Sequence, residues 1–377
     1  MVTGPSPQTV EIIRNRLLNI VDEMELVEMR SAYSILWQEA GDLSNAILSR
    51  DFEVLAQAKR SIPMHLGTMG PPAKEAIEKI GGVDNLRPGD VIVQNDPYRG
   101  NNHLNDFLMV KPIFVDGEII AFSTAKGHIP DVGGSVFSSC NYTATEIYAE
   151  GIRLPPSKIV KEGERNEELI DIIMANIRNP DEMIGNVEAE IAGVVRGEKR
   201  FQELLRKYDV ATVKACIKQI LDNSEKLMRA KIKELQDGIY EAEDYIDPVE
   251  TGGPKRDPLK ITCSVKIDGT NMKFDFSGTD RQVEGAINSA YWLSTTGVNY
   301  AAKISLIPGE PGNGGHYRPI EVFIPEGTLL NPQFPAAVHA FWDTGTRTFD
   351  VVCRALAKAL PPEKALAAGD GSTNGFY

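Results

Sequence analysis

Two of the five histidines of this chain lie among aspartates, in the segments NDPYRGNNHLND and GHIPDVGG. His103 and His128 are each followed three residues later by an aspartate, Asp106 and Asp131. Imidazole nitrogens and carboxylate oxygens are the ligands of catalytic Zn²⁺ and Mn²⁺ sites. The residue types in this stretch therefore indicate metal-dependent chemistry.

His103, Asp106 and His128 are the candidate metal ligands. The two histidines are separated by two β-rich runs and the turn Asp116-Gly117, so the chain is expected to return to the same edge of a sheet. Three protein ligands with open positions form a catalytic site, in which an ion lowers the pKa of water and polarises an oxygen. Two loop histidines hydrogen-bonded to neighbouring aspartates explain the same pattern, and the residues alone leave both interpretations open.

Asp131 and Asp96 are the candidate catalytic carboxylates. Asp131 can act as a fourth ligand, as a partner that orients His128, or as a general base. Asp96 precedes Pro97, so an Asx-turn is its alternative role. The remaining histidines are expected to be structural, although the first of them can also line a pocket: His65, His316 and His339.

No motif of this chain indicates nucleotide binding. The sequence lacks GxGxxG, GxSxG and HExxH, and its GNGGHYR segment lacks the GxxxxGK[ST] form of a phosphate-binding loop. A cofactor-binding residue is therefore not assigned within this chain.

Helical and strand patterns alternate along the chain, which predicts a mixed α/β (α+β) fold. Apolar residues at helical spacing predict helices over residues 9–34, 72–80, 167–235, 286–307 and 344–360. Pro180 and Asp209 should divide the third of these. We expect three regions: an N-terminal α/β region with the metal loops (1–160), a helical region (161–240) and a C-terminal α/β region (241–377).

Composition and charge exclude several classes of protein. The chain has 377 residues, 42% hydrophobic and 25% charged, with a net charge of −13 and no basic patch, so a nucleic-acid partner is not expected. No apolar run reaches the ~18 residues that a membrane span requires, and no signal peptide is evident. Four widely spaced cysteines favour reduced thiols and a cytoplasmic location.

Ordered motifs along most of the chain resemble the hydantoinase B/oxoprolinase family. The sequence contains, in this order, RPGDVIVQNDPYRGNNHLNDFLMVKPIFVDGEIIAF, GHIPDVGG, ATEIYAEGIRLPP, ANIRNPDEMIGN, FDFSGTD, YRPIEVFIPEGTLLNP and FDVVCRALAKALP. That family comprises B-type subunits of ATP-dependent hydantoinases, the corresponding half of 5-oxoprolinases, caprolactam-hydrolysing relatives, and a large subunit of acetone and acetophenone carboxylases.

The resemblance implies a hetero-oligomer that contains a hydantoinase A-type partner. That partner would bind ATP and Mg²⁺ and phosphorylate the substrate oxygen, after which the B-type subunit completes hydrolysis or carboxylation. In metal-containing members of the family, an HxxD pair and a later histidine hold a divalent ion, Zn²⁺ or Mn²⁺. The matching residues here are His103, Asp106 and His128.

Three departures from the family pattern bear on the substrate. The chain stops at ALAAGDGSTNGFY, where family members continue, so we expect a truncated, split or processed subunit. A KERxD-like stretch is replaced by LWQEAGDLSNAI, which weakens the transfer of hydantoinase specificity. HLGTMG and the NNH before the metal motif are closer to the ketone-carboxylase branch.

The expected function is hydrolysis of a phosphate-activated cyclic amide, such as a hydantoin, an oxoproline or a lactam. Two alternatives remain: a large subunit of an ATP-dependent, biotin-independent ketone carboxylase, and a non-catalytic scaffold subunit of such a complex.

Overall fold

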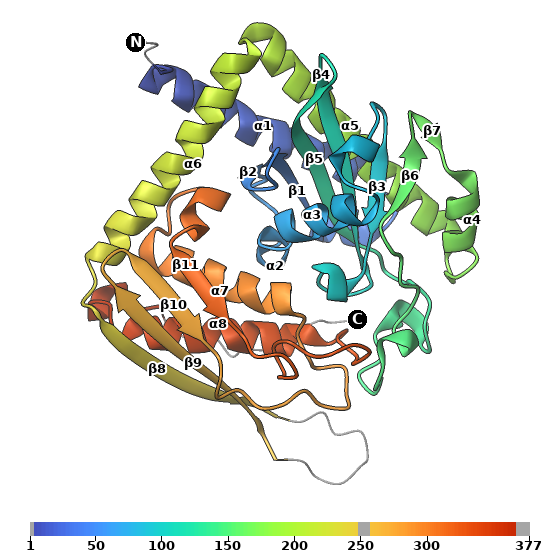
Figure 1. Cartoon of the computed structure of the whole chain (residues 1–377). Coiled ribbons are helices and arrows are strands. Elements are labelled where there is room, and N and C mark those ends of the chain that lie inside the picture. The colour runs from blue at the N-terminus through green and yellow to red at the C-terminus, as the bar shows by residue number, and fades with distance from the viewer. Residues whose placement is uncertain (1–3, 248–256, 367–377) are drawn as a thin grey trace. The chain divides into compact units, whose positions relative to one another are not determined.

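The computed structural model describes residues 4–247 and 257–366 (Figure 1). Its backbone contacts divide the chain into two compact units, each containing helices and one sheet. Unit 1 is built from Met1–Gly133, Ile152–Ser224 and Pro311–Gly315, and unit 2 from Gly134–Gly151, Glu225–Glu310 and His316–Tyr377. The mixed α/β class is therefore confirmed. The three-region division at residues 160 and 240 stays a prediction, and most of the ALAAGDGSTNGFY segment lies outside the described residues.

Unit 1 contains a seven-stranded antiparallel sheet in the order β2-β1-β5-β4-β3-β6-β7. Its strands are β1 (Leu43–Ser49), β2 (Val54–Gln57), β3 (Val91–Gln94), β4 (Asp106–Val115), β5 (Glu118–His128), β6 (Ser157–Lys161) and β7 (Glu164–Arg165). The longest strands, β4 and β5, are joined by Asp116 and Gly117, both with positive φ (50° and 85°). Positive φ at both turn residues matches the twist of a hairpin, so the expected hairpin is confirmed.

The helices of unit 1 cover both faces of this sheet. They are α1 (Pro7–Ser31), α2 (Pro63–Leu66), α3 (Gly70–Lys79), α4 (Glu167–Met174), α5 (Pro180–Lys207) and the first part of α6 (Val210–Lys233). Apolar residues of α1, α5 and α6 form one core with Ile47 of β1. Apolar residues of α3 form another core with Leu48 of β1 and Leu108 of β4. Neighbouring strand residues point to opposite faces, so Ile47 and Leu48 serve different cores.

Local sequence explains where the long helices begin. Ser6 accepts a hydrogen bond from the Thr9 backbone N–H (3.2 Å), and Pro7 occupies the first turn of α1. Pro180 opens α5 in the same way, and Asp209 accepts a 2.8 Å bond from the Thr212 backbone N–H at the start of α6. The predicted breaks at Pro180 and Asp209 are therefore confirmed.

Unit 2 contains a four-stranded sheet in the order β11-β10-β9-β8. Its strands are β8 (Gly238–Ile246), β9 (Leu259–Asp268), β10 (Asn271–Asp275) and β11 (Ile320–Phe323), and its helices are α7 (Tyr291–Leu306) and α8 (Phe341–Ala357). Alternate residues of β9 are buried and join α7 and α8 in one core. The predicted helices over 286–307 and 344–360 are therefore confirmed, with starts at Tyr291 and Phe341.

Short helical segments occupy several connections. They are η1 (Leu36–Ala40, a π-helix), η2 (Val83–Asn85), η3 (Pro97–Arg99), η4 (Phe137–Ser139), η5 (Ile147–Ala149), η6 (Gly314–Tyr317) and η7 (Pro362–Lys364). Within the described ranges, no helix combines the length and the apolar character that crossing a membrane requires. All four cysteines are free thiols.

Candidate metal centre

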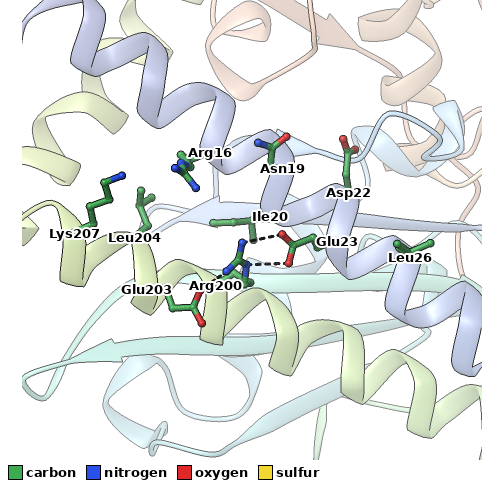
Figure 2. A pocket seen from close by; sticks show the side chains of 10 residues that line it. All are labelled: Arg16, Asn19, Ile20, Asp22, Glu23, Leu26, Arg200, Glu203, Leu204 and Lys207. Atoms are coloured by element: carbon green, nitrogen blue, oxygen red, sulfur yellow. Dashed lines mark hydrogen bonds and ion pairs between the residues drawn. The ribbon is translucent and has the colours of Figure 1, made fainter.

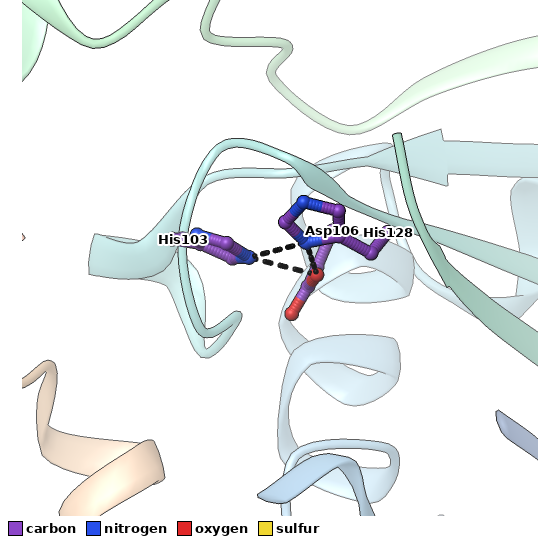
Figure 3. A group of neighbouring side chains, drawn as sticks. All are labelled: His103, Asp106 and His128. Atoms are coloured by element: carbon purple, nitrogen blue, oxygen red, sulfur yellow. Dashed lines mark hydrogen bonds and ion pairs between the residues drawn. The ribbon is translucent and has the colours of Figure 1, made fainter. Parts of the chain in front are cut away.

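His103, Asp106 and His128 converge at one end of the β4–β5 hairpin (Figure 3). His103 Nε2 lies 2.9 Å from Asp106 Oδ1 and 3.0 Å from His128 Nδ1, and His128 Nδ1 lies 3.3 Å from the same carboxylate oxygen. In the described part of the chain, this is the one group of three or more potential ligand residues whose atoms all lie within 4.8 Å. The structure therefore brings together the three residues that the sequence singled out.

The hairpin register places two of these residues opposite each other. Asp106 is the first residue of β4 and His128 the last of β5, and the two are partners in the antiparallel ladder. Directly opposed residues of a ladder have Cβ atoms about 5 Å apart on the same face of the sheet. His103 precedes β4 by a short turn, in which the Asp106 N–H donates to the His103 carbonyl (3.2 Å). This turn returns the His103 ring toward the carboxylate.

His65 is a functional candidate that the sequence reasoning assigned to a structural role. It lies in α2, and its Nε2 is 3.2 Å from Asp106 Oδ2, the carboxylate oxygen that does not face His103. Its other nitrogen, Nδ1, lies 3.0 Å from Ser44 Oγ, which accepts a 2.9 Å bond from the Ile62 N–H. Ser44 Oγ thus lies within hydrogen-bond distance of Nδ1, whereas Nε2 approaches Asp106 Oδ2 at 3.2 Å without the geometry of a hydrogen bond. Neighbours of a ligating carboxylate help to orient it.

Burial and neighbouring charge set the protonation of the trio. Burial lowers the pKa of His103, and the nearby Asp106 only partly opposes this effect. Burial alone would raise the pKa of Asp106, but His103 and His65 together hold it well below its ordinary value. For His128, burial lowers the pKa, yet the hydrogen bond to Asp106 and the charge of Asp42 outweigh burial and raise it. A neutral His103 beside an ionised Asp106 provides two lone pairs at the centre of the group.

Asp42 and Lys126 are two further residues that the sequence reasoning did not single out. Asp42 lies immediately before β1, its carbonyl accepts a bond from the His128 N–H (3.1 Å), and its carboxylate raises the pKa of both His103 and His128. Lys126 is fully buried and donates to the carbonyl and hydroxyl oxygens of Thr68, both at 2.7 Å. Burial lowers the pKa of Lys126 to about 7. Asp42 and the buried Lys126 thus add ionisable groups beside the three ligand candidates.

The opposite face of β5 fixes the backbone of the centre. The buried Trp37 indole donates to the His128 carbonyl (2.7 Å) and packs on Gly127, where an added Cβ would lie 2.0 Å from the ring. Beyond the strand, Asn105 and Ile129 exchange two bonds of 2.8 Å, one from a backbone N–H and one from the Asn105 side chain. The ligand candidates are therefore carried by a rigid segment.

Asp131 and Asp96 have defined structural contacts. Asp131 accepts bonds from the Gly133 N–H (2.9 Å) and from Arg178 (2.8 Å). Asp96 accepts a 3.0 Å bond from the Tyr98 N–H, which is an Asx-type cap of η3. The catalytic roles predicted for Asp131 and Asp96 stay predictions.

A separate hollow of about 520 Å³ lies on the surface of unit 1 between α1 and α5 (Figure 2). Arg200 binds the Glu23 carboxylate with two contacts of 2.9 Å and also pairs with Glu203. The lining as a whole carries three basic residues and three acidic ones, so its formal charges cancel and indicate no particular ligand: Arg16, Arg200 and Lys207 against Asp22, Glu23 and Glu203.

The donor set of the trio fits a divalent ion. Bonds of about 2.0–2.2 Å in tetrahedral geometry place ligand atoms roughly 3.3–3.6 Å apart, close to the separations of the three atoms here. His103 Nε2 faces two acceptor atoms, Asp106 Oδ1 and His128 Nδ1, and a single proton satisfies only one of them. Protonation of His128 offers a purely hydrogen-bonded alternative, which agrees with its raised pKa. The geometry accommodates both arrangements.

Comparison with known proteins places the chain in a family. The family model described as hydantoinase B/oxoprolinase matches residues 6–377. The caprolactamase subunit beta of Pseudomonas jessenii is 34% identical over 368 residues, which is 97% of this chain and 64% of that protein. The crystal structure of the ATP-dependent caprolactamase from Pseudomonas jessenii superposes with a TM-score of 0.89 at 33% identity, covering 96% of this chain and 61% of that one.

A nucleotide-free acetone carboxylase structure shares the fold, with a TM-score of 0.85 at 21% identity over 94% of this chain and 48% of that one. This chain therefore spans less than two thirds of each of these proteins. The match extends over nearly its whole length, and the chain belongs to the hydantoinase B/oxoprolinase family.

Proposed function

We propose that this chain is the metal-binding B-type subunit of an ATP-dependent enzyme that hydrolyses a phosphate-activated cyclic amide. The observation that carries the proposal is the convergence of His103 Nε2, Asp106 Oδ1 and His128 Nδ1. His65 Nε2 lies 3.2 Å from the second oxygen of Asp106. The similarity to a caprolactamase subunit supports an amide substrate. Zn²⁺ and Mn²⁺ both suit two imidazoles and one carboxylate.

An ion at this site would supply Lewis acidity toward the oxygen of water or of the activated amide. The protein's own residues would do the rest. His65 lies beside Asp106 Oδ2 while Oδ1 faces the two histidines, and the low pKa of Asp106 keeps it ionised. His103 is almost fully buried, whereas 21% of the His128 side chain is exposed. Substrate would therefore approach from the side of His128.

Proton transfer is proposed for Asp131, as a general base or as a group that orients His128, with Asp96 as a second carboxylate. Arg178 Nη1 lies 2.8 Å from Asp131 Oδ2, so substrate binding would have to displace the arginine before that oxygen could accept a proton. Asp131→Asn should therefore lower turnover without removing the metal. Because Asp131 also bonds the Gly133 N–H, a thermal unfolding measurement must accompany the kinetics.

The partner would be a hydantoinase A-type subunit that binds ATP and Mg²⁺ and makes the phosphorylated intermediate, giving a cytoplasmic hetero-oligomer. The relative named as subunit beta supports a complex of unlike subunits. Co-purification from the native host would identify the partner.

Elemental analysis of the purified complex tests the metal assignment. We expect about one Zn²⁺ or Mn²⁺ per chain, which is lost in His128→Ala and Asp106→Asn but retained in His339→Ala, a buried histidine of unit 2. Full metal content and full activity in His128→Ala would show that the assignment is wrong. Absence of metal, together with unchanged turnover in Asp106→Asn, would instead support the scaffold alternative.

ATP consumption separates hydrolysis from carboxylation. The proposal expects bicarbonate-independent consumption with a lactam, hydantoin or 5-oxoproline. Bicarbonate-dependent consumption with acetone or acetophenone would favour the ketone carboxylase, whose fold this chain shares.

A further inference from the structure

The short helix α2, which carries His65, is held to the sheet at both of its ends. At its start, the Ile62 N–H donates to Ser44 Oγ (2.9 Å), and the same hydroxyl lies 3.0 Å from His65 Nδ1. At its end, Lys126 Nζ donates to the carbonyl and hydroxyl oxygens of Thr68, each at 2.7 Å. A helix of four residues has little stability of its own, so these side chains determine where α2 lies.

The two residues that hold α2 lie side by side on the sheet. Ser44 of β1 and Lys126 of β5 are partners in the antiparallel ladder, and such partners share one face of a sheet. His128 follows Lys126 by two residues, and Asp106 is the ladder partner of His128, so both lie on this face as well. The sheet face that carries two of the three ligand candidates therefore also carries both residues that hold α2.

Thr68 connects Lys126 to the backbone of His65. The Thr68 hydroxyl accepts the bond from Lys126 and donates to the His65 carbonyl (3.0 Å), and the Thr68 N–H donates to the same carbonyl (3.1 Å). The His65 ring lies beside the centre, with Nε2 3.2 Å from Asp106 Oδ2. A continuous set of contacts therefore runs from Lys126 to the ligand carboxylate.

We propose that Lys126 is a positioning residue of the metal centre, which holds α2 so that His65 stays beside Asp106. The inference rests on the proposed function and adds to it a residue that acts through Thr68 and His65. Without Lys126, the end of α2 can move away from the sheet, and Asp106 Oδ2 loses its polar neighbour. The ion should then bind more weakly although the protein stays folded.

A direct effect of charge is the alternative. Burial lowers the pKa of Lys126, and the carboxylates of Asp106 and Glu190 partly oppose this effect, so the charge of Lys126 also acts on a ligand candidate. The two routes differ in variants that combine Lys126 with His65. An effect that passes through His65 disappears once His65 is replaced, whereas a direct charge effect adds to that of the His65 replacement.

The test uses the full chain, purified with the subunit that accompanies it. Competition with a chromophoric chelator gives the Zn²⁺ affinity, the visible spectrum of bound Co²⁺ reports the ligand geometry, and circular dichroism gives the unfolding midpoint. Thr68→Val removes the hydroxyl at nearly equal size, Thr68→Ser keeps it, and Lys126→Met removes the amine. Thr124→Val is the matched control, because it removes a buried hydroxyl of β5 that bonds the Ala46 carbonyl (3.0 Å) instead of α2.

We expect Thr68→Val and Lys126→Met to weaken Zn²⁺ binding by about tenfold, the lower end of the range for residues that support metal ligands. Both variants should change the Co²⁺ spectrum in the same way as His65→Leu. Thr68→Ser and Thr124→Val should retain wild-type affinity. Lys126→Met combined with His65→Leu should bind Zn²⁺ as His65→Leu alone does, within about twofold.

Three results would overturn the inference. The first is wild-type affinity in both Thr68→Val and Lys126→Met. The second is additive loss in the double variant, which would assign Lys126 to a direct charge effect. The third is a lower unfolding midpoint with unchanged affinity and spectrum, which would assign it to stability alone. If Lys126→Met does not fold, the comparison of Thr68→Val with Thr124→Val decides the question.

Metal binding by the wild-type complex separates this inference from the proposed function. A complex that binds neither Zn²⁺ nor Co²⁺ contradicts the proposed function, and the inference fails with it. A complex that binds both ions, with equal affinity in the wild-type, Thr68→Val and Lys126→Met forms, contradicts only the role of Lys126.

Discussion

Replacing His65 should weaken metal binding without unfolding the protein. His65 Nε2 lies 3.2 Å from Asp106 Oδ2, while Asp106 Oδ1 faces His103 and His128. In His65→Leu the carboxylate loses this polar neighbour and can rotate, so Oδ1 is no longer held toward the histidines. The variant therefore tests whether the carboxylate is oriented in advance.

The size of the effect follows from the kind of bond that is lost. A hydrogen bond to a charged group contributes about 1.5–3 kcal/mol, and each 1.4 kcal/mol is a factor of ten in affinity. The contact of 3.2 Å between His65 Nε2 and Asp106 Oδ2 lacks hydrogen-bond geometry, which places its contribution at the lower end of that range. We expect His65→Leu to weaken Zn²⁺ or Mn²⁺ binding by about 10- to 30-fold, within the range measured for partners of metal ligands.

Competition with a chromophoric chelator measures the affinity, and circular dichroism establishes that each variant is folded. The matched variant is His65→Gln, whose Nε2 can replace the imidazole donor and should stay within about threefold of wild-type affinity. Ser44→Ala removes the hydroxyl that bonds His65 Nδ1, and its metal affinity should fall between those of the two His65 variants.

Two outcomes would refute this reasoning. Wild-type affinity in His65→Leu would mean that other contacts orient Asp106. Equal weakening in His65→Gln and His65→Leu would mean that the ring acts by packing, not by donating a proton to the carboxylate.

Burial and packing elsewhere lead to three more expected results. Gly127→Ala should lower the free energy of unfolding by about 1–3 kcal/mol, because its Cβ would lie 2.0 Å from the Trp37 ring; an unchanged urea midpoint would contradict this. Glu198→Gln should lower the free energy of unfolding by about 1–3 kcal/mol, because it leaves the buried Lys111, 3.2 Å away, without its counter-charge. The double variant Lys111→Met with Glu198→Leu should recover most of this free energy in urea unfolding. Burial raises the pKa of Glu150 to about 8, so the native state holds a proton that the unfolded state releases near pH 4.5. The free energy of unfolding should therefore fall by up to roughly 4 kcal/mol as pH rises from 4.5 to 8. Urea titrations of Glu150→Gln should lack this pH dependence.

Local sequence was sufficient to predict the hairpin that builds the centre. Asp116-Gly117 fixes a two-residue turn, which sets the first pair of the ladder, Val115 and Glu118. Counting on from that pair alone would place Asp106 opposite Gly127. The register shift between Ile113 and Phe114 brings Asp106 opposite His128 instead, and the sequence did not predict this shift. The helix boundaries at Pro180 and Asp209 could also be predicted from local sequence, because capping and the missing proline N–H act within one helical turn.

His65 could not be found in this way because its role depends on contacts distant in sequence. It lies in a helix of four residues, Pro63–Leu66, which is too short to show a periodic pattern. The hydroxyl that bonds its Nδ1, that of Ser44, belongs to β1, and the carboxylate beside its Nε2 begins β4. No local pattern records that these segments meet.

Asp42 could not be identified from the sequence because its position at the centre depends on the strand order of the sheet. The pairing of β1 with β5 aligns Leu43 with Gly127, so the residue before β1 comes beside the last residue of β5, which is His128. The pairing of the first strand with the fifth therefore places Asp42 among the charges at the centre. Its influence on both histidines is therefore a consequence of topology, and side-chain spacing along one segment cannot reveal it.

The sequence also could not predict which asparagine side chains of the loop form hydrogen bonds. In the sequence, NDPYRGNNHLND indicates turns, because asparagine and glycine favour them. In the structure, Asn95, Asn101 and Asn105 each bind a backbone carbonyl, whereas the buried Asn102 binds none. Identical residue types in one short segment thus divide into three whose side chains donate to backbone carbonyls and one whose side chain does not. Only the accounting of donors and acceptors in the folded chain separates them.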